Sequence, residues 1–177
     1  MEIEKTLVVA AKDIRKRTRA LGREITRDYA KKELLVIGIL NGAFIFAADL
    51  VREINLPLEI DFVRVSSYGT QTVSSGELKF SKGVELAVSG KDVLLVEDIV
   101  DTGLTIKRLR QYLAAFSPKS IKICALIDKK ERRETEVSID YIGFEVSQGF
   151  LVGYGLDCAE KYRNYPDIYH LRINTIE

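Results

Sequence analysis

The sequence predicts an α/β fold: an open, parallel core sheet flanked by helices. Short, continuous apolar runs alternate with segments of helical periodicity along most of the 177 residues. Strands that are separated by helices are normally joined by right-handed crossovers, which makes neighbouring strands parallel. The apolar runs are bounded by charged residues or glycine, which is typical of strands buried on both faces. A single domain is expected, since domains commonly contain about 100–200 residues.

The first half of the chain contains two predicted helices and two predicted strands. The helices are indicated by apolar residues at spacings of three and four, such as Leu21 and Ile25. One strand is indicated by an unbroken apolar run, and the other by alternation of apolar and polar residues. The expected elements are a helix over 10–32, a strand over 34–40, a helix over 43–53 and a strand over 58–65.

A polar segment with three glycines, residues 66–83, interrupts this pattern. It predicts either a long loop or a weak hairpin, and a loop of this length in a compact domain is often a functional lid. Alternation of helix and strand resumes after it. The expected elements are a strand over 93–96, a helix over 104–116, a strand over 121–127 and shorter strands at 141–144 and 151–152.

Composition narrows the functional class only a little. Lys and Arg number 27 against 26 Asp and Glu, so the net charge of +1 is far below that of a typical nucleic-acid binder. The chain has two cysteines, Cys124 and Cys158, with no CxxC spacing that would indicate a zinc site. No apolar run approaches the roughly 20 residues of a membrane span, and no leader pattern is evident. We therefore expect a cytoplasmic protein with no membrane partner.

An acidic turn follows the predicted strand over 93–96. Glu97, Asp98 and Asp101 stand within five positions of one another, just before a helix begins. Ligands of open α/β sheets bind beyond the carboxyl ends of the strands, which is where these carboxylates lie. A helix cap would account for Thr102 or Thr105. It does not account for three carboxylates, which repel one another and need compensating partners.

The residues after the acidic turn are suited to an anion. Thr102, Gly103, Leu104 and Thr105 open a helix, whose free amides and dipole favour a phosphate group. Carboxylates beside a phosphate must face something else, and sugar hydroxyls or a hydrated metal ion would suit them. The pattern describes a ribose-5-phosphate site. Neither GxxxxGK nor GxGxxG occurs, so the site resembles neither a P-loop nor a dinucleotide fold.

Residues 96–105 resemble the signature for 5-phosphoribosyl-1-pyrophosphate (PRPP) in type I phosphoribosyltransferases. Four further segments resemble the pyrophosphate loop, the catalytic loop and the purine and metal region of the hypoxanthine-guanine enzymes. These segments are 38–43, 66–69, 149–157 and 162–164. Together the resemblance spans about residues 34 to 170.

The resemblance implies one phosphoribosyltransferase domain over 1–177. Its core would cover about 34–145. Its hood would use N-terminal residues and about 146–177, and its mobile loop would cover about 66–82. It implies transfer of phosphoribose from PRPP to N9 of a 6-oxopurine, with Mg²⁺ as cofactor, in a homodimer or homotetramer.

The resemblance also implies roles for single residues. Asp101 would be the general acid/base at purine N7, and its ordinary alternative is a helix N-cap. Lys129 would donate to purine O6, with Lys130 as the alternative one position along. Phe150 would stack on the base and Leu151 would offer backbone groups. The groups implied are, for ribose-phosphate, Glu97, Asp98, Asp101, Thr102, Gly103, Leu104 and Thr105; for pyrophosphate, Leu40, Asn41, Gly42 and Arg163; for the loop, Ser67 and Tyr68; for purine, Lys129, Phe150, Leu151 and Asp157; and for metal, Glu97, Asp98 and Asp157.

The chain departs from the family pattern at Asn41, where many relatives carry Lys, so one charge near pyrophosphate is absent. Two alternatives to a hypoxanthine-guanine enzyme remain open. One is a preference for xanthine, which shares the 6-oxo group. The other is a PRPP-sensing regulator that binds nucleic acid through the basic helix that includes Arg15, Lys16 and Arg19. The net charge of +1 speaks against the regulator.

Overall fold

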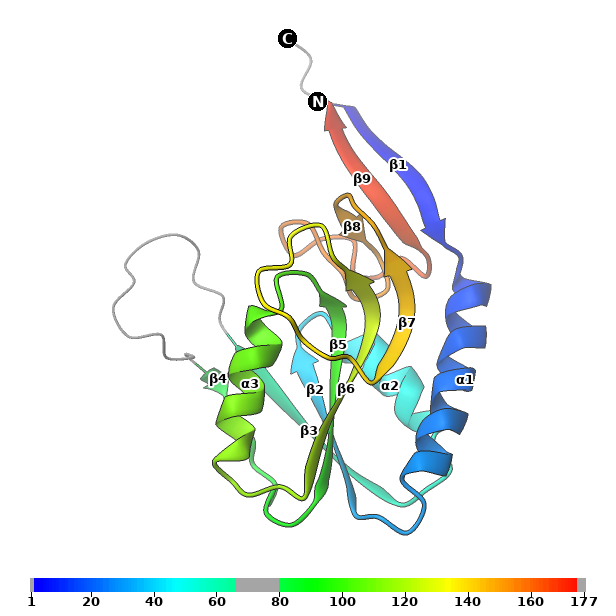
Figure 1. The fold of residues 1–177 in the computed structure, drawn as a ribbon. Coiled ribbons are helices and arrows are strands. Elements are labelled where there is room, and N and C mark those ends of the chain that lie inside the picture. Colours follow the sequence, from blue (N-terminus) through cyan, green and yellow to red (C-terminus); the bar gives the residue numbers. More distant parts are fainter. Residues whose placement is uncertain (1, 66–79, 175–177) are drawn as a thin grey trace, which may run out of the picture.

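The computed structural model describes residues 2–65 and 80–174. Its main sheet has six strands in the order β4-β3-β2-β5-β6-β7. All neighbours are parallel except β3 and β4 (Figure 1). The strands are β2 (Leu34–Leu40), β3 (Leu58–Val65), β4 (Phe80–Lys82), β5 (Asp92–Val100), β6 (Ser120–Lys129) and β7 (Tyr141–Val146).

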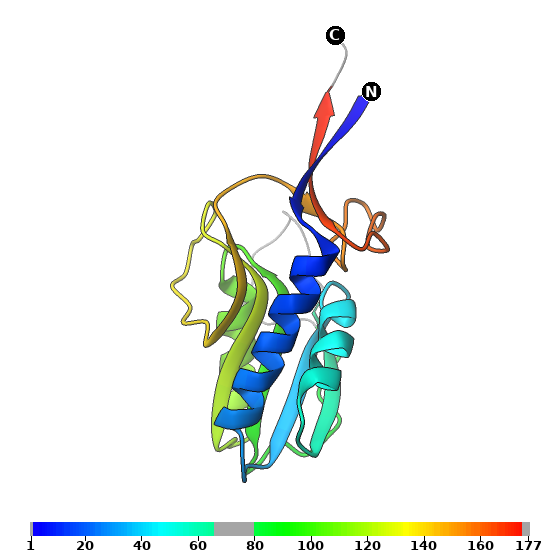
Figure 2. The same ribbon diagram turned by 90° about the vertical axis from the view of Figure 1, so that its right-hand side faces the viewer.

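Helices cover both faces of this sheet. On one face lie α1 (Ala11–Asp28) and α2 (Phe44–Glu53), and on the other lies α3 (Leu104–Ala114) (Figures 1 and 2). Alternate strand residues point to opposite faces, so Leu34 packs with α1 and α2 while Leu35 packs with α3. The central strands are therefore apolar on both sides, which explains their continuous hydrophobic runs.

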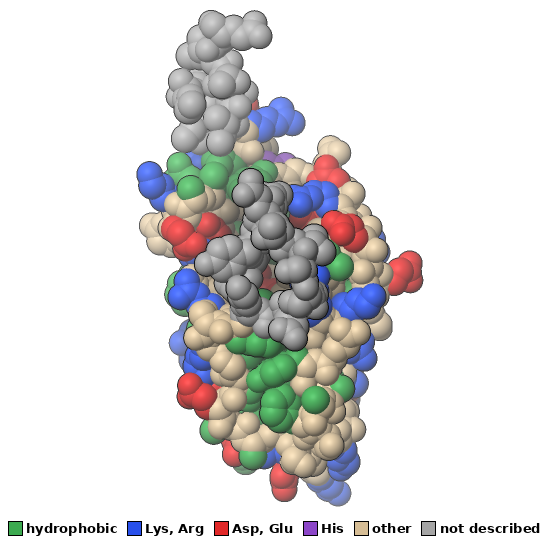
Figure 3. Space-filling model, turned by 90° about the vertical axis from the view of Figure 1, so that its left-hand side faces the viewer, with side chains coloured by type: hydrophobic (Ala, Val, Ile, Leu, Met, Phe, Trp, Pro, Cys, Tyr) green, Lys and Arg blue, Asp and Glu red, His purple; other side chains and the backbone are tan. Residues whose placement is uncertain are grey.

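The face that carries α3 and β4 also has an aromatic cluster. The ring of Tyr112 lies 4.3 Å from that of Phe80 and 5.0 Å from that of Phe116, measured between centroids. Phe116 is 44% exposed. Figure 3 shows hydrophobic side chains gathered in the lower part of this face, with charged side chains around them.

A second, smaller sheet stands above the carboxyl ends of the main strands, and we call it the hood (Figure 1). It is antiparallel, in the order β1-β9-β8, and is built from β1 (Glu2–Val9), β8 (Leu151–Val152) and β9 (Ile168–Asn174). Two hydrogen bonds tie the segments next to β8 and β9 to the helices of the main sheet. The Ala11 amide of α1 donates to Asp167 Oδ1 at 2.7 Å, and the Tyr154 hydroxyl donates to Asp49 Oδ2 of α2 at 2.6 Å.

Most expected elements are present, but their ends differ. The strands over 34–40 and 58–65 are confirmed with those bounds. The first helix ends at Asp28 rather than near 32, because the chain turns through Lys31 with φ 64 before β2. The strand expected over 93–96 extends to Val100, because its pairing with β6 continues beyond Glu97. Strands β1 and β9 were not predicted.

The segment 66–79 lies outside the described residues, so the expected catalytic loop is not described, nor are Ser67 and Tyr68. Its predicted continuation, residues 80–82, forms the short strand β4. Within 2–65 and 80–174, none of the helices has both the length and the apolar character needed to cross a membrane.

Candidate active site

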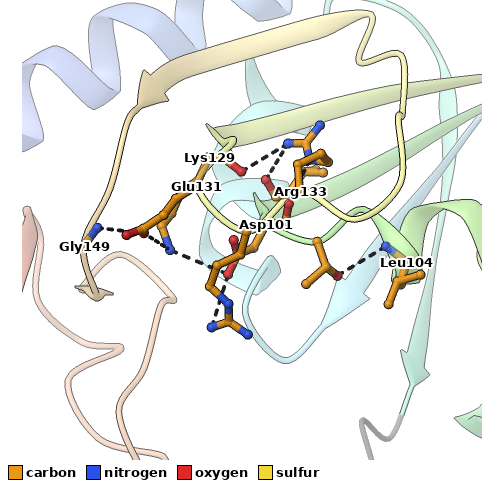
Figure 4. Close-up of polar contacts among 9 residues, drawn as sticks. Asp101, Leu104, Lys129, Glu131, Arg133 and Gly149 are labelled. Atoms are coloured by element: carbon orange, nitrogen blue, oxygen red, sulfur yellow. Dashed lines mark hydrogen bonds and ion pairs between the residues drawn. The ribbon is translucent and has the colours of Figure 1, made fainter.

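Asp101 and Lys129 meet where two neighbouring strands of the main sheet end. Asp101 follows β5 directly, and Lys129 is the last residue of β6. The parallel register pairs Val100 with Asp128, so the next residues of both strands lie side by side. Asp101 Oδ2 is 3.6 Å from Lys129 Nζ (Figure 4). Lys129, which lies beyond the end of the strand expected over 121–127, is thus a strand residue and only 5% exposed.

The two carboxylate oxygens of Asp101 have different surroundings. Oδ2 lies 3.6 Å from Lys129 Nζ and also 3.6 Å from Arg132 Nη1. Oδ1 is buried and accepts no hydrogen bond from any described residue. A buried, unpartnered carboxylate oxygen is unfavourable unless a ligand supplies a donor. This oxygen is therefore suited to accept a hydrogen bond from an N–H group of a bound molecule.

Lys130 occupies a different environment from Lys129. Its side chain is 66% exposed, and its Nζ lies 3.8 Å from Asp128 Oδ2 and 4.0 Å from Glu145 Oε1. Adjacent residues at the end of a strand point to opposite faces. Of the two lysines, only Lys129 is within 4.0 Å of Asp101.

Glu97 and Asp98 lie within β5 rather than in a loop after it, which corrects the expected end of that strand. Glu97 is 7% exposed and Asp98 is 9% exposed. Burial raises the pKa of Glu97 well above its usual range, and the neighbouring charge of Asp98 raises it further. Burial also raises the pKa of Asp98. Such carboxylates would be stabilised by hydroxyl donors or a cation.

The turn from β5 into α3 presents backbone amides. Gly103 precedes the helix with φ 83, and Thr102 Oγ1 accepts the Leu104 amide at 3.3 Å. The carbonyl of Thr102 accepts two amides, those of Glu134 and Thr135, each at 3.0 Å. The loop after β6 therefore fixes this turn. Leu104 and the exposed Thr105 begin the helix, where amide groups and the dipole favour an anion.

Arg133 holds the ends of β5 and β6 together, and the sequence did not single it out. Its Nε donates to the Asp101 carbonyl at 2.8 Å, and its Nη2 donates to the carbonyls of Val100 at 2.9 Å and Lys129 at 3.2 Å (Figure 4). Its Nη2 also pairs with the buried Asp128 carboxylate at 2.5 Å. In the sequence, Arg133 is one member of a charged run and looks like a solvated surface residue.

A second group of residues surrounds Arg163. Its Nη2 lies 2.9 Å from both Asp157 Oδ1 and Glu160 Oε2, and its Nη1 donates to the Gly155 carbonyl at 2.7 Å. The adjoining cavity has a volume of about 460 Å³. It is lined by Leu40, Asn41, Phe44, Glu160 and Arg163.

The loop after β2 lies directly against the acidic pair. A Cβ atom on Gly42 would stand 1.8 Å from Asp98 Oδ2, so only glycine fits this approach. Gly155 packs as closely on the other side, since a Cβ atom there would lie 2.1 Å from the Gly42 carbonyl oxygen. The Leu40–Asn41 peptide is cis. The loop thus joins the Glu97 and Asp98 carboxylates to the Arg163 cavity.

The segment that leads into β8 approaches Lys129 from the hood. Phe150 is 53% exposed, whereas Leu151 is 6% exposed. The Gly149 amide donates to Glu131 Oε2 at 3.1 Å, and the same oxygen lies 3.2 Å from Lys129 Nζ (Figure 4). Phe150 directly follows Gly149, and an exposed aromatic ring is a good platform for a flat ligand.

The three carboxylates expected to hold a metal are not gathered into one cage. Throughout the described part of the chain, no three His, Cys, Asp or Glu side chains form a group that could hold a metal ion. Asp157 instead pairs with Arg163. Oxygen donors do fit a hard cation such as Mg²⁺, which is commonly held by one or two carboxylates together with substrate phosphates. The donor set therefore fits a metal that arrives with its substrate.

Known proteins resemble this chain over nearly its whole length. The sequence pattern of the phosphoribosyl transferase domain matches residues 8–159. A hypoxanthine-guanine phosphoribosyltransferase from Aquifex aeolicus is 47% identical over 164 residues, which is 92% of each chain. The protein of that name from Bacillus subtilis is 47% identical over 167 residues, covering 94% of this chain and 92% of its own.

A solved structure shares the fold. The crystal structure of a hypoxanthine-guanine phosphoribosyltransferase from Bacillus anthracis superposes with a TM-score of 0.89 at 39% identity. It covers 97% of this chain and 100% of its own. The α/β fold expected from the resemblance, with its parallel core sheet flanked by helices, is confirmed. On these grounds, the chain belongs to the phosphoribosyltransferase family.

Proposed function

We propose that this chain is a purine-salvage enzyme that transfers phosphoribose from PRPP to N9 of hypoxanthine or guanine. The products are IMP or GMP and pyrophosphate. The observation that carries the proposal is the pair at the ends of β5 and β6: a buried Asp101 oxygen with no hydrogen-bond partner among the described residues, beside the buried Lys129 ammonium. The full-length relatives named hypoxanthine-guanine phosphoribosyltransferases support it.

In this proposal, the base is recognised by Lys129 and Asp101. An ammonium group has three donors and no acceptor, so Lys129 suits the 6-oxo group and disfavours the 6-amino group of adenine. The Asp101 carboxylate would take the proton from N7 of the base as the new bond forms. Phe150 would stack on the base, and the backbone of Leu151 would meet its edge.

Glu97 and Asp98 would accept hydrogen bonds from the two ribose hydroxyls, while the amides from Thr102 to Thr105 bind the 5-phosphate. The carboxylate pair lies near the end of β5 and the amides lie at the turn into α3 that follows, so the two groups would meet one sugar phosphate. The transition state is expected to resemble an oxocarbenium ion at the ribose C1′, beside this carboxylate pair. Electrostatic positioning of the charged groups would supply most of the catalysis.

The leaving pyrophosphate would occupy the cavity beside Leu40, Asn41, Gly42 and Arg163. The planar guanidinium of Arg163 suits bidentate contact with phosphate oxygens. We propose Mg²⁺ as the cofactor, held by Asp157 and by the Glu97–Asp98 pair through water and the substrate. The metal would neutralise charge on the leaving group. Asn41 contributes no charge, so Arg163 is the cation among the described residues that line the cavity.

The alternative of a nucleic-acid regulator is weakened by the contacts of α1. Arg17 donates to the carbonyls of Ile142 and Gly143, and Arg19 pairs with Glu53. Part of the basic face therefore serves packing between elements. Homodimeric or homotetrameric assembly and a cytoplasmic location stay predictions, and sedimentation analysis would test the first.

The test is PRPP-dependent nucleotide formation with hypoxanthine, guanine, xanthine and adenine in the presence of Mg²⁺. We expect turnover with hypoxanthine and guanine and very little with adenine. A wide margin in favour of xanthine would overturn the proposed base preference. Absence of turnover with every base, together with salt-dependent binding of nucleic acid, would favour the regulator instead.

A further inference from the structure

The carboxylate of Glu131 joins the end of β6 to the segment that leads into β8. Its Oε2 lies 3.2 Å from Lys129 Nζ and accepts the Gly149 amide at 3.1 Å. Lys129 belongs to the main sheet, and Gly149 immediately precedes Phe150 (Figure 4). One carboxylate oxygen thus connects the two sides between which a flat base would lie.

The Lys129 ammonium has two carboxylates within 4.0 Å among the described residues, Glu131 at 3.2 Å and Asp101 at 3.6 Å. The Lys129 side chain is 7% exposed, so water competes little for its donors. Its position is therefore set mainly by the balance between these two carboxylates. Without Glu131, the ammonium would be drawn toward Asp101, which Arg132 already approaches.

We propose that Glu131 is a positioning residue for base recognition: it holds the Lys129 ammonium near the segment that contains Gly149 and Phe150 and limits its approach to Asp101. The proposal rests on the proposed function, because it takes Lys129 to be the donor to the 6-oxo group. One of the three ammonium donors is used by Glu131, and the others remain for the ligand. The Gly149 amide donates to the same Glu131 oxygen, so the segment before β8 is held at the same carboxylate as the Lys129 ammonium.

The expected effect is moderate because the Glu131 side chain is 42% exposed. Ion pairs with an exposed partner are weakened by water and salt, so we expect removal of Glu131 to raise KM about fivefold. The change should fall on the 6-oxopurine alone. In the proposed function, the phosphoribosyl and pyrophosphate groups would lie against Thr102 and Arg163, and Glu131 contacts neither residue in the described part of the chain.

The experiment compares Glu131→Ala, Glu131→Gln and the control Glu136→Ala. Glu136 is exposed on the same loop and takes part in none of the ion pairs among the described residues. We expect Glu131→Ala to raise KM for hypoxanthine and guanine, with kcat and KM for PRPP within about twofold of wild type. Glu131→Gln keeps an acceptor for the Gly149 amide, so its KM for the two bases should lie between those of wild type and Glu131→Ala. Thermal unfolding midpoints verify that all variants are folded.

A double-mutant cycle with Lys129→Met separates positioning from a merely structural role. If Glu131 acts through Lys129, Glu131→Ala has no further effect on KM once Lys129 is replaced. An equal effect in both backgrounds would overturn the proposal, as would a KM for Glu131→Ala that matches Glu136→Ala. These results leave the proposed function intact. A wild-type chain that forms no nucleotide from either base would overturn both.

Discussion

Asp101 and Lys129 occupy the ends of adjacent parallel strands, with 3.6 Å between Oδ2 and Nζ, and the other Asp101 oxygen has no partner among the described residues. Purine N7 and O6 lie on one edge of a 6-oxopurine, so a carboxylate and an ammonium side by side match that edge. The register of β5 with β6 creates the match. It requires no special backbone conformation at either residue.

Lys129→Met should raise KM for hypoxanthine and guanine. A hydrogen bond from a charged group contributes about 1.5–3 kcal/mol, so kcat/KM should fall about tenfold to a hundredfold. Discrimination against adenine should weaken at the same time. The control is Lys130→Met, whose side chain is 66% exposed on the other face. Equal losses in both variants would contradict the assignment of Lys129.

Arg133→Met should destabilise the chain because the carboxylate of Asp128, only 4% exposed, loses its nearest cation and keeps only the exposed Lys130 at 3.8 Å among the described residues. Breaking a buried ion pair in this way costs about 3 kcal/mol, measurable as the free energy of unfolding in urea. Adding Asp128→Asn should restore part of the loss. The matched control, Arg132→Met at a 68% exposed side chain, should change stability little. Strictly additive effects of the two substitutions at Arg133 and Asp128 would contradict this role.

Gly103→Ala should impair PRPP binding and stability together. Gly103 has φ 83, and a Cβ atom there would lie 2.5 Å from the Thr135 carbonyl oxygen. Gly90 has a similar φ of 75, but a Cβ atom there would have no neighbouring atom within 4 Å. Gly90→Ala therefore measures the cost of the backbone conformation without a steric clash. We expect losses of about 3 kcal/mol for Gly103→Ala and about 1 kcal/mol for Gly90→Ala. If both variants lose the same unfolding free energy and Gly103→Ala leaves KM for PRPP unchanged, the turn tolerates a methyl group and the prediction is wrong.

Glu97→Gln should stabilise the free protein at neutral pH and impair catalysis. Burial raises the pKa of Glu97 above its usual 4.5, so the folded chain binds this proton more tightly than the unfolded chain does. The resulting stabilisation is complete below about pH 4.5 and is lost as the pH rises through the folded pKa. The gap in unfolding free energy between variant and wild type should therefore grow with pH. A gap independent of pH would contradict this account.

The central strands were predictable because their chemistry is local. The run Leu34–Leu40 is apolar throughout, so this strand can be recognised from its own residues without reference to any other element. The ends of strands were less predictable. Glu97 and Asp98 look like loop residues, yet pairing with β6 carries β5 past them, and the cost of burying their charge appears in their raised pKa values. Pairing with the neighbouring strand here overrides local preference.

The hood strands and Arg133 escaped prediction for a different reason. Strand β1 has its charged residues in the first half and apolar residues at its end, and its partner β9 lies at the opposite end of the chain. Local sequence carries no sign of such a pairing. Arg133 and Arg132 are adjacent and chemically identical, and only the positions of three carbonyls and one carboxylate distinguish them.

The most direct test of the central claim is the turnover of Asp101→Asn with PRPP and hypoxanthine, measured beside its affinity for IMP. The asparagine keeps the size of the side chain and loses the proton acceptor. We expect kcat to fall about a hundredfold or more, in line with loss of a general acid/base, while IMP affinity stays within about threefold of wild type. An unchanged kcat would remove Asp101 from the mechanism and contradict the account.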